Sequence, residues 1–276
     1  MKILITGAKG QVGAELTQLC KAHGHDYLAT GREDLDIGSC QDTFRVVRDF
    51  QPDVIFNAAA YTVVDRAENE PDAAERINHI GALNLAEAAF EVGAVLLHIS
   101  TDFVFDGIKE GPYEEQDSCA PLSVYGRTKY EGERAVRHVG GRYIILRTSW
   151  VFGGKVNFVN TMRRLAEDRD ELNVVSDQRG GPTPASEIAG ALIDIATKVT
   201  KPGFEDWGIY HFSGAPAVSW YEFACEILRG HPKVQVYPIP SSGYPTPAAR
   251  PANSVLNCQK IQNVFGIEQP NWREFL

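Results

Sequence analysis

The sequence predicts an α/β protein in which helices cover both faces of a parallel β-sheet, the doubly wound arrangement, with a smaller C-terminal part. Three observations support this fold class. Short apolar runs alternate with segments of helical length up to Trp150, which is the spacing of βαβ units with parallel strands. A glycine-rich turn joins the first apolar run to the first helix. After Trp150 the alternation loosens, and prolines gather between Pro238 and Pro251.

The expected strands are short and almost wholly apolar, as is typical of parallel strands that are buried on both faces. The helices between them carry apolar residues three to four positions apart, and Ser39 and Pro71 suit helix N-termini. A capping-box pattern from Ser219 to Glu222 predicts one further helix. We expect strands at 3–5, 27–29, 54–56, 95–99, 143–146 and 208–212, and helices at 11–22, 39–50, 71–92, 122–136, 158–167 and 188–197.

Composition narrows the class of function. The formal net charge is −9, so the surface repels nucleic acid and anionic membranes, and neither is an expected partner. The five cysteines are odd in number and form no CxxC pair, which favours a reducing compartment over a disulfide framework. The N-terminal apolar stretch is too short for a signal peptide, and no run reaches the length of a membrane helix. We therefore expect a cytoplasmic protein.

The glycine-rich turn spans residues 7–13, and each of its glycines has a physical task. Gly7 permits a tight turn, Gly10 lets a pyrophosphate approach the backbone, and Gly13 lets the helix pack closely on the strand. The N-terminus of the following helix offers unpaired N–H groups and the positive end of its dipole to phosphates. Because the strand–turn–helix context is also present, the pattern predicts dinucleotide binding over a purely structural turn.

The end of the second expected strand bears on the choice of cofactor. An acidic residue there usually binds the ribose of NAD, but residues 29–32 contain none. Arg32 can instead meet the 2′-phosphate of NADPH, so NADPH is favoured over NADH. The alternative interpretation of Arg32 is a solvated surface charge.

Tyr125 and Lys129 are four residues apart on an expected helix and so share one face. A nearby ammonium favours tyrosinate, which would lower the phenol pKa and suit Tyr125 to protonate a carbonyl oxygen. The same lysine can hold the ribose of a nicotinamide nucleotide. The ordinary alternative for such a pair is a part-buried tyrosine beside a surface lysine.

The ends of two other strands supply further candidate groups. Ser100, Thr101 and Asp102 end the fourth strand, and the carboxyl ends of parallel strands line the ligand-binding edge of such a sheet. The Thr101 hydroxyl can polarise the same carbonyl oxygen that Tyr125 protonates. The third strand ends in a run of small residues at 57–60, which would let a dinucleotide lie close to the backbone.

Taken together, these patterns resemble the extended short-chain dehydrogenase/reductase superfamily and, within it, the dTDP-4-dehydrorhamnose reductase family. The similar stretches span nearly the whole chain, and the later ones are specific to this family. They are GAKGQVG (7–13), PDVIFNAAAYTVVDRAE (52–68), STDFVFDG (100–107), PLSVYGRTKYEGE (121–133), RTSWVFG (147–153), DQRGGPTPA (177–185) and YPTPAARPANSVLN (244–257).

The resemblance implies an NADPH- or NADH-dependent enzyme that reduces the C4 ketone of a dTDP-linked sugar. It implies a Rossmann-type sheet and a set of residue roles. The catalytic set would be Thr101, Tyr125 and Lys129. The cofactor would be lined by Gly7, Gly10, Gln11, Val12, Asp36, Ile37, Ala58, Ala59 and Tyr61, with Tyr125 and Lys129, and with Arg32 as argued above. The substrate would meet Thr62, Val63, Thr101, Asp102, Tyr125 and Trp150, and either Arg179 or Arg250 at its diphosphate. For the two arginines, a structural salt bridge is the alternative.

The same patterns suggest how the chain is divided. We expect residues 1–150 to form the dinucleotide-binding domain, which the chain rejoins at about 185–213. Residues 151–184 and 214–276 would form the smaller substrate-binding part.

The resemblance also bears on whether Mg²⁺ bridges two copies of the chain. Some members of the family dimerise through Mg²⁺ held by glutamates, and Glu15 and Glu187 match two of them. No residue follows Leu276 to supply the third, so we expect no metal-bridged dimer and assign no metal ligand. The expected assembly is a monomer or a weak homodimer.

Two other functions remain open at this point. One is an epimerase or dehydratase of the same superfamily that recycles bound NAD, although Asp102-Phe103 does not provide the acidic pair that dehydratases use. The other is a non-catalytic protein, because the regulatory subunit of methionine adenosyltransferase resembles this family. Net consumption of NADPH would separate a reductase from both.

Overall fold

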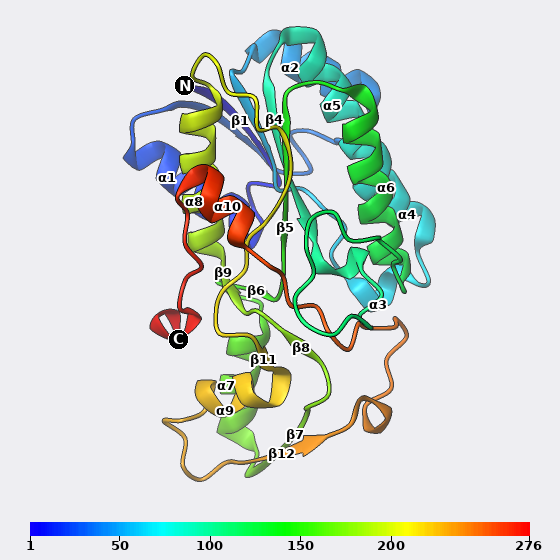
Figure 1. Ribbon diagram of the computed structural model, residues 1–276, viewed down its shortest axis with the longest axis vertical. Helices are drawn as coiled ribbons and strands as arrows, with labels where there is room; N and C mark the ends of the chain where they lie inside the picture. Colours follow the sequence, from blue (N-terminus) through cyan, green and yellow to red (C-terminus); the bar gives the residue numbers. More distant parts are fainter.

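Six parallel strands form the central sheet of the computed structural model, which describes residues 1–276 (Figure 1). Their order across the sheet is β10-β5-β4-β3-β1-β2. The predicted parallel α/β sheet is therefore confirmed, including the late strand that returns to its edge. The strands are β1 (Lys2–Thr6), β2 (Asp26–Thr30), β3 (Val54–Asn57), β4 (Val95–Thr101), β5 (Tyr143–Thr148) and β10 (Gly208–His211).

The strand order reverses beside β1, and this position defines where a ligand can bind. The chain leaves β1 for β2 on one side and then returns to β3 on the other. Thr6 is in register with Thr30 and with Asn57, so these three strands end at the same level. In open α/β sheets, ligands bind at the carboxyl ends of the strands at such a reversal.

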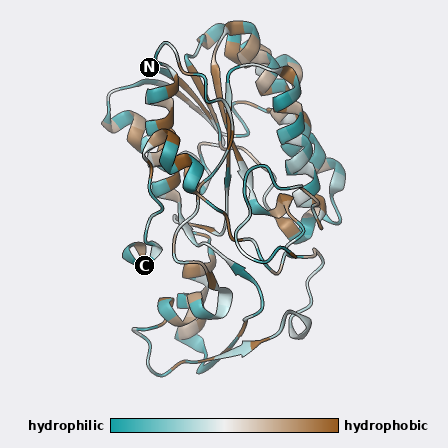
Figure 2. Ribbon diagram, in the orientation of Figure 1, coloured by the Kyte–Doolittle hydropathy of each residue, from teal (hydrophilic) through white to brown (hydrophobic).

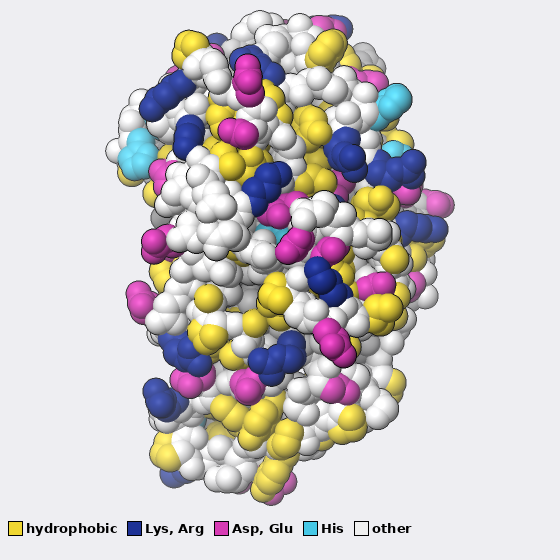
Figure 3. Space-filling view, in the orientation of Figure 1, with side chains coloured by type: hydrophobic (Ala, Val, Ile, Leu, Met, Phe, Trp, Pro, Cys, Tyr) yellow, Lys and Arg dark blue, Asp and Glu magenta, His cyan; other side chains and the backbone are white.

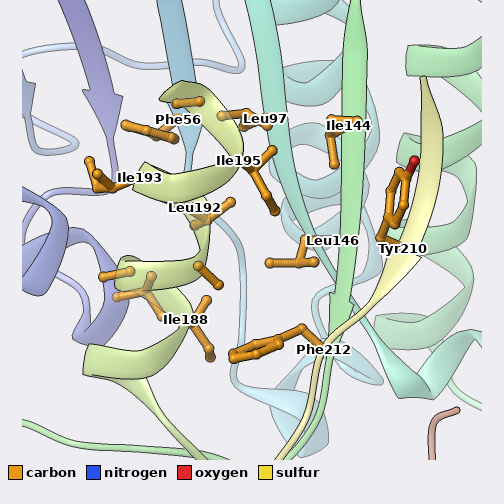
Figure 4. Packing of buried hydrophobic residues seen from close by; sticks show 14 of the residues in the cluster. Phe56, Leu97, Ile144, Leu146, Ile188, Leu192, Ile193, Ile195, Tyr210 and Phe212 are labelled. Atoms are coloured by element: carbon orange, nitrogen blue, oxygen red, sulfur yellow. The ribbon is translucent and has the colours of Figure 1, made fainter. Parts of the chain in front are cut away.

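Helices cover both faces of the sheet, and alternate strand residues serve the two faces. Ile3 and Ile5 pack on the face that carries α8, whereas Leu4 packs on the opposite face. Figure 4 shows α8 residues such as Leu192 against strand residues of the first face, and Figure 2 shows the apolar strands within the layers. The first face carries α1 (Gln11–Ala22), α8 (Ala185–Val199) and α10 (Gln259–Phe265), and the second carries α2 (Cys40–Phe50), α5 (Gly81–Val92) and α6 (Val124–Val139).

The helix expected over 71–92 is not a single α-helix. It consists of α4 (Pro71–Glu75), a π-helical turn η1 (Arg76–Ile80) and α5. Close approaches accompany this break: a Cβ added to Gly81 would lie 2.7 Å from Ile37, and one added to Gly132 would lie 2.2 Å from the Asn78 carbonyl oxygen. The hydrophobic pattern continues through a π turn, so the sequence gives no sign of this interruption.

Most of the remaining elements lie below the carboxyl ends of the main strands in Figure 1. Their own buried cluster includes Phe152, Val174, Phe223 and Trp272. The parallel pair β7 and β12 was not predicted, because its strands are separated by about sixty residues of intervening chain. The elements are α3 (Val64–Ala67), η2 (Asp102–Val104), β6 (Val151–Phe152), α7 (Phe158–Asp168), β7 (Glu171–Val175), β8 (Arg179–Gly180), β9 (Thr183–Pro184), β11 (Val218–Ser219), α9 (Trp220–Ile227), β12 (Gln235–Ile239), η3 (Ser241–Gly243) and η4 (Trp272–Phe275).

Acidic and basic side chains are interspersed over the face shown in Figure 3. None of the helices combines the length and the apolar composition that crossing a bilayer requires.

Candidate active site

The glycine-rich turn lies at the reversal of strand order, between β1 and α1. Gly7 has a φ of +69°, which favours glycine, and a Cβ added to it would lie 2.6 Å from the Ala58 carbonyl oxygen. A Cβ added to Gly13 would lie 2.2 Å from the Gly7 carbonyl oxygen. The Gly10 N–H closes the turn by donating to that same oxygen at 2.9 Å. The turn is thus as tight as the sequence predicts.

The N-terminus of α1 is left open toward a ligand. Gly10 is its N-cap and provides no side-chain hydrogen bond, and the first turn has no acidic residue. The first N–H groups of the helix, at Gln11 and Val12, therefore lack intrahelical partners and present a positive dipole end. The Gln11 Oε1 atom is buried without a hydrogen-bond partner. The open N–H groups fit the phosphates of a dinucleotide, and the unpaired Gln11 oxygen fits one of its amide groups.

Arg32, which follows β2, is a cation without an ion-pair partner near the glycine-rich turn. Arg32 is exposed and forms no ion pair, whereas its neighbour Glu33 is paired with Lys9 at 2.7 Å. Asp36 accepts a hydrogen bond from the Gly38 N–H at 3.0 Å and is also paired with Arg76. Ile37 is buried in the core, so its backbone is the part that a cofactor can reach.

The end of β3 faces the turn with small side chains. The Ala58 N–H donates to the Thr6 carbonyl oxygen at 3.2 Å, and the Ala59 N–H donates to the Asn57 side chain at 3.2 Å. Tyr61 is fixed at both ends: its N–H donates to Asn78 at 2.8 Å, and its hydroxyl donates to Glu70 at 2.7 Å. This segment is held rigidly without any bulky side chain at 58–60.

Tyr125 and Thr101 meet at the carboxyl end of β4. Tyr125 lies in the first turn of α6, which Ser123 caps by accepting from the Gly126 N–H at 3.1 Å. Burial raises the pKa of Tyr125 to about 12, a hydrogen bond with Thr101 lowers it, and the charge of Asp102 raises it. The expected lowering of the phenol pKa by Lys129 is therefore wrong for this structure, because burial dominates and Lys129 does not contribute.

Lys129 lies one helical turn beyond Tyr125 and is only 2% exposed. Its ammonium donates to the Ile99 carbonyl oxygen at 2.6 Å rather than lying against the Tyr125 hydroxyl. Burial lowers the pKa of Lys129 to about 8, and the negative charge of Glu133 raises it. The structure thus brings Tyr125 and Thr101 together and places Lys129 behind them, on the backbone of β4.

Asp102 follows Thr101 and is buried. Its Oδ1 atom accepts a hydrogen bond from the Thr101 hydroxyl at 3.0 Å, and its Oδ2 atom has no partner. Burial raises the pKa of Asp102 to about 6, while the Ser254 and Thr101 hydroxyls lower it. Thr101 and Asp102, which were both expected to contact the substrate, are therefore hydrogen-bonded to each other.

The expected sugar contacts differ in their surroundings. Trp150 has a φ of +46°, an uncommon conformation for a bulky residue, and its ring stacks on Trp220 with 3.5 Å between centroids. A Cβ added to Gly180 would lie 2.6 Å from that ring. Thr62 and Val63 are exposed, at the start of the short helix α3.

Both arginines of the substrate-side motifs form ion pairs. Arg250 makes two hydrogen bonds to Asp65, at 3.0 and 2.9 Å, and so ties the 244–257 segment to α3. Arg179 is half-exposed, approaches Glu222 at 3.4 Å and donates to the Ala217 carbonyl oxygen at 3.2 Å. Arg179 is the more accessible of the two, because its ion pair is longer and more solvated.

Sequence reasoning missed a buried network behind the catalytic helix. Arg147 on β5 makes two hydrogen bonds to Glu133 on α6, at 2.9 and 2.6 Å. Ser100 donates to Glu133 at 2.5 Å, and the two charged side chains are at most 1% exposed. The one signal in the sequence was the position of Arg147 at the end of an apolar strand, because Glu133 lies among the other charged residues of α6. The network joins β4, β5 and α6, the three elements that carry Thr101, Tyr125 and Lys129.

Asn78 is a second residue that the sequence did not single out. It lies in the π turn, accepts from the Tyr61 N–H and donates to the Thr128 hydroxyl at 3.1 Å. It therefore links the segment after β3 to the residue that precedes Lys129.

Of the two glutamates that match the family's magnesium site, Glu187 lies near Glu274 at the C-terminal end of the chain. The negative charge of Glu274 raises the pKa of Glu187, after the larger effect of burial, so these carboxylates are neighbours. The third glutamate was looked for only beyond Leu276, so Glu274 was not considered as a candidate. The structure contains no group of three or more His, Cys, Asp or Glu side chains arranged to hold a metal.

A dinucleotide-binding turn at the reversal of a parallel sheet, with tyrosine and lysine four residues apart beside a threonine, defines the class as a short-chain dehydrogenase/reductase. The family model described as the RmlD substrate binding domain matches residues 1–276. A curated dTDP-4-dehydrorhamnose reductase from Aggregatibacter actinomycetemcomitans is 47% identical over 100% of this chain and 97% of that protein. The chain therefore belongs to the dTDP-4-dehydrorhamnose reductase family, as the sequence motifs predicted.

Solved structures agree with this assignment. A dTDP-4-dehydrorhamnose reductase from Clostridium acetobutylicum has a TM-score of 0.94 and 40% identity, covering 99% of this chain and 96% of that one. The enzyme of the same name from Bacillus anthracis, solved in complex with NADP, has a TM-score of 0.92 and 37% identity, with the same coverage.

Proposed function

We propose that the protein is a reductase that uses NADPH, or NADH, to convert the C4 ketone of dTDP-4-dehydrorhamnose (dTDP-4-dehydro-6-deoxy-L-mannose) to the alcohol of dTDP-L-rhamnose. The observation that carries the proposal is the meeting of Tyr125 and Thr101 at the carboxyl end of β4, beside a turn shaped for a dinucleotide. The names of the relatives and the NADP in one of them support the same activity.

The cofactor fits the residues around the turn. Gly7, Gly10, Gln11 and Val12 would hold its pyrophosphate, because they combine a close backbone approach with open N–H groups. Arg32 would meet the 2′-phosphate of NADPH, since it has no competing ion pair. When bound, the reduced nicotinamide supplies a hydride to the C4 carbon.

Tyr125 serves as the general acid. A phenol whose pKa is raised to about 12 by burial keeps its proton at neutral pH and gives it up only to a stronger base, such as a developing alkoxide. Thr101 stabilises the same oxygen through its hydroxyl. Lys129, with a pKa of about 8, remains largely charged at neutral pH and would turn from the Ile99 carbonyl oxygen toward the ribose of the cofactor.

The part of the molecule below the main sheet would hold the rest of the substrate. Trp150 and the exposed Thr62 and Val63 would contact the sugar, and Arg179 is better placed than Arg250 to contact the diphosphate. We assign the cofactor to residues 1–150, with 185–213, and the sugar nucleotide mainly to 151–184 and 214–276. We further propose a monomer or weak homodimer acting in the cytoplasm, which the free thiols of all five cysteines support.

The experiment follows NADPH absorbance with dTDP-, GDP- and UDP-linked 4-keto sugars. We expect turnover with the dTDP-linked sugar and a loss of about 10²–10⁴-fold in kcat for Tyr125→Phe. Tyr130→Phe is the matched control, because Tyr130 lies on the same helix and packs against the apolar core. A Tyr125→Phe variant with full kcat would rule out the general-acid role.

The same measurement bears on the other two functions. An epimerase or dehydratase that recycles its cofactor consumes no net NADPH, and a regulatory subunit consumes none with any sugar. Absence of NADPH consumption across the whole panel would therefore overturn the proposed reduction.

A further inference from the structure

The last residues of β4 meet two side chains of α6. The Ser100 hydroxyl donates to Glu133 Oε1 at 2.5 Å, and the Lys129 ammonium donates to the Ile99 carbonyl oxygen at 2.6 Å. Thr101, which stabilises the C4 oxygen in the proposed reduction, is the next and last residue of the strand. The position of Thr101 relative to α6 therefore depends on what holds the two residues before it.

The chain just beyond Thr101 is also held against α6, at the first turn of the helix. The Phe103 ring packs edge-on against the Tyr125 ring, with 5.5 Å between centroids. A Cβ added to Gly126 would lie 2.2 Å from the Phe103 carbonyl oxygen, so the two backbones approach closely there. Thr101 thus lies between two attachments of the chain to α6, the Phe103 contact on one side and the pair of hydrogen bonds described above on the other.

The two hydrogen bonds before Thr101 differ in whether the reaction disturbs them. In the proposed reduction, Lys129 turns from the Ile99 carbonyl oxygen to the ribose of the cofactor, so its contact with β4 is lost when the cofactor binds. Glu133 has no part in that movement, and its hydrogen bond to Ser100 is kept. A hydrogen bond to a carboxylate is also shorter and stronger than one between neutral groups. The bond between Ser100 and Glu133 is therefore the contact that holds this strand end during turnover.

Glu133 is itself fixed, because Arg147 holds it from the neighbouring strand. Arg147 Nε donates to Glu133 Oε1 at 2.9 Å, and Nη2 donates to Oε2 at 2.6 Å. Ser100 and Arg147 are partners in the register of β4 and β5, so both side chains reach the same carboxylate. Arg147 Nη2 also donates to Cys119 Sγ at 3.2 Å. Ser100, Glu133 and Arg147 are each at most 2% exposed, so water does not compete for these bonds.

We propose that Ser100 and Glu133 are positioning residues: their hydrogen bond keeps Thr101 in place against α6 after Lys129 has moved to the cofactor. The inference rests on the proposed reduction and deepens it, because it gives a kinetic role to a contact that touches neither cofactor nor substrate. Ser100 and Glu133 transfer no proton and act only through Thr101. Such placement matters, since an error of about 1 Å in a reacting group can cost on the order of 10²-fold in rate.

Ser100→Ala tests the proposal, because it removes the hydroxyl and leaves the pair of Glu133 and Arg147 intact. The measured quantity is the rate of NADPH oxidation in a single turnover, with the protein in excess over dTDP-4-dehydrorhamnose. We expect this rate to fall about 10-fold, while the KM for NADPH changes by less than about twofold, since the glycine-rich turn is untouched. Ser213→Ala is the matched control and should keep the wild-type rate. Ser213 is also 2% exposed, and its hydroxyl meets Cys258 Sγ at 3.7 Å, outside this network.

A double-mutant cycle with Thr101 separates positioning from a general loss of structure. If Ser100 acts through Thr101, then Ser100→Ala should lower the single-turnover rate by less than about twofold in protein that already carries Thr101→Val. An equal loss in both backgrounds, or no loss in Ser100→Ala alone, would overturn the inference and leave Ser100 and Glu133 as stabilising residues only. Failure of the wild type to oxidise NADPH with any sugar would instead overturn the proposed reduction.

Discussion

The two faces of the central sheet are built differently. On the face that carries α8, residues such as Leu192 and Ile195 pack against Phe56 and Leu97 in a continuous apolar layer (Figure 4). On the face that carries α6, the core contains Glu133, Arg147, Lys129 and Asn78 as well as apolar side chains. Both faces are tightly buried, but only the second carries polar groups close to the candidate catalytic residues.

This difference shows how the fold combines stability with chemistry. Burial of an apolar side chain such as Leu192 stabilises the sheet directly. Burial of Glu133 and Arg147 is tolerated because they satisfy each other and Ser100 through short hydrogen bonds. The polar face thus gives up some of the stabilisation that apolar packing provides and, in return, fixes α6 against β4 and β5.

The largest effect that tests this comparison is expected from Glu133→Gln. Breaking a buried pair leaves the Arg147 charge without its partner, so we expect a loss of about 3–5 kcal/mol in the free energy of unfolding, measured with urea. The double variant Glu133→Gln with Arg147→Met should lose less than the two single variants together. Removing the exposed pair of Arg48 and Glu91 should change the free energy of unfolding by no measurable amount. Additive losses in the double variant would show that the buried pair is not coupled.

A somewhat smaller effect is expected on the apolar face. Leu192→Ala removes a fully buried side chain and leaves a cavity, so we expect a loss of about 2–5 kcal/mol in the free energy of unfolding. The folded variant should keep its kcat, because Leu192 packs in an apolar cluster that includes neither Thr101 nor Tyr125. Leu122→Ala, at a half-exposed position, is the control and should change stability by about 0.5 kcal/mol or less. A loss of kcat in folded Leu192→Ala would mean that the two faces are not functionally separate.

Much of the apolar architecture could be predicted from the sequence. The strands are short apolar runs, and the turn at 7–13 signals its glycine geometry locally, so the sheet and the cofactor edge were both foreseen. The pairing of β7 with β12 was not, because it depends on segments far apart in the chain. The π turn also escaped prediction, since residues 76–80 continue a helical pattern.

The sequence predicted which residues form the candidate site better than it predicted their pKa values. Tyr125 and Thr101 were brought together as expected. The direction of the Tyr125 pKa shift was wrong, because spacing along a helix does not show that Lys129 binds a backbone carbonyl or that burial outweighs its charge. The raised pKa of Asp102 likewise depends on how the 244–257 segment closes over it, which no local pattern encodes.

The most direct test of the account is transfer of deuterium to dTDP-4-dehydrorhamnose from NADPH that carries deuterium at both hydrogen positions of nicotinamide C4. NMR of the isolated product should show one deuterium at C4 of the sugar for each NADPH oxidised. Product without deuterium at that carbon, or conversion of the sugar with no oxidation of NADPH, would contradict the proposed reduction of the C4 ketone.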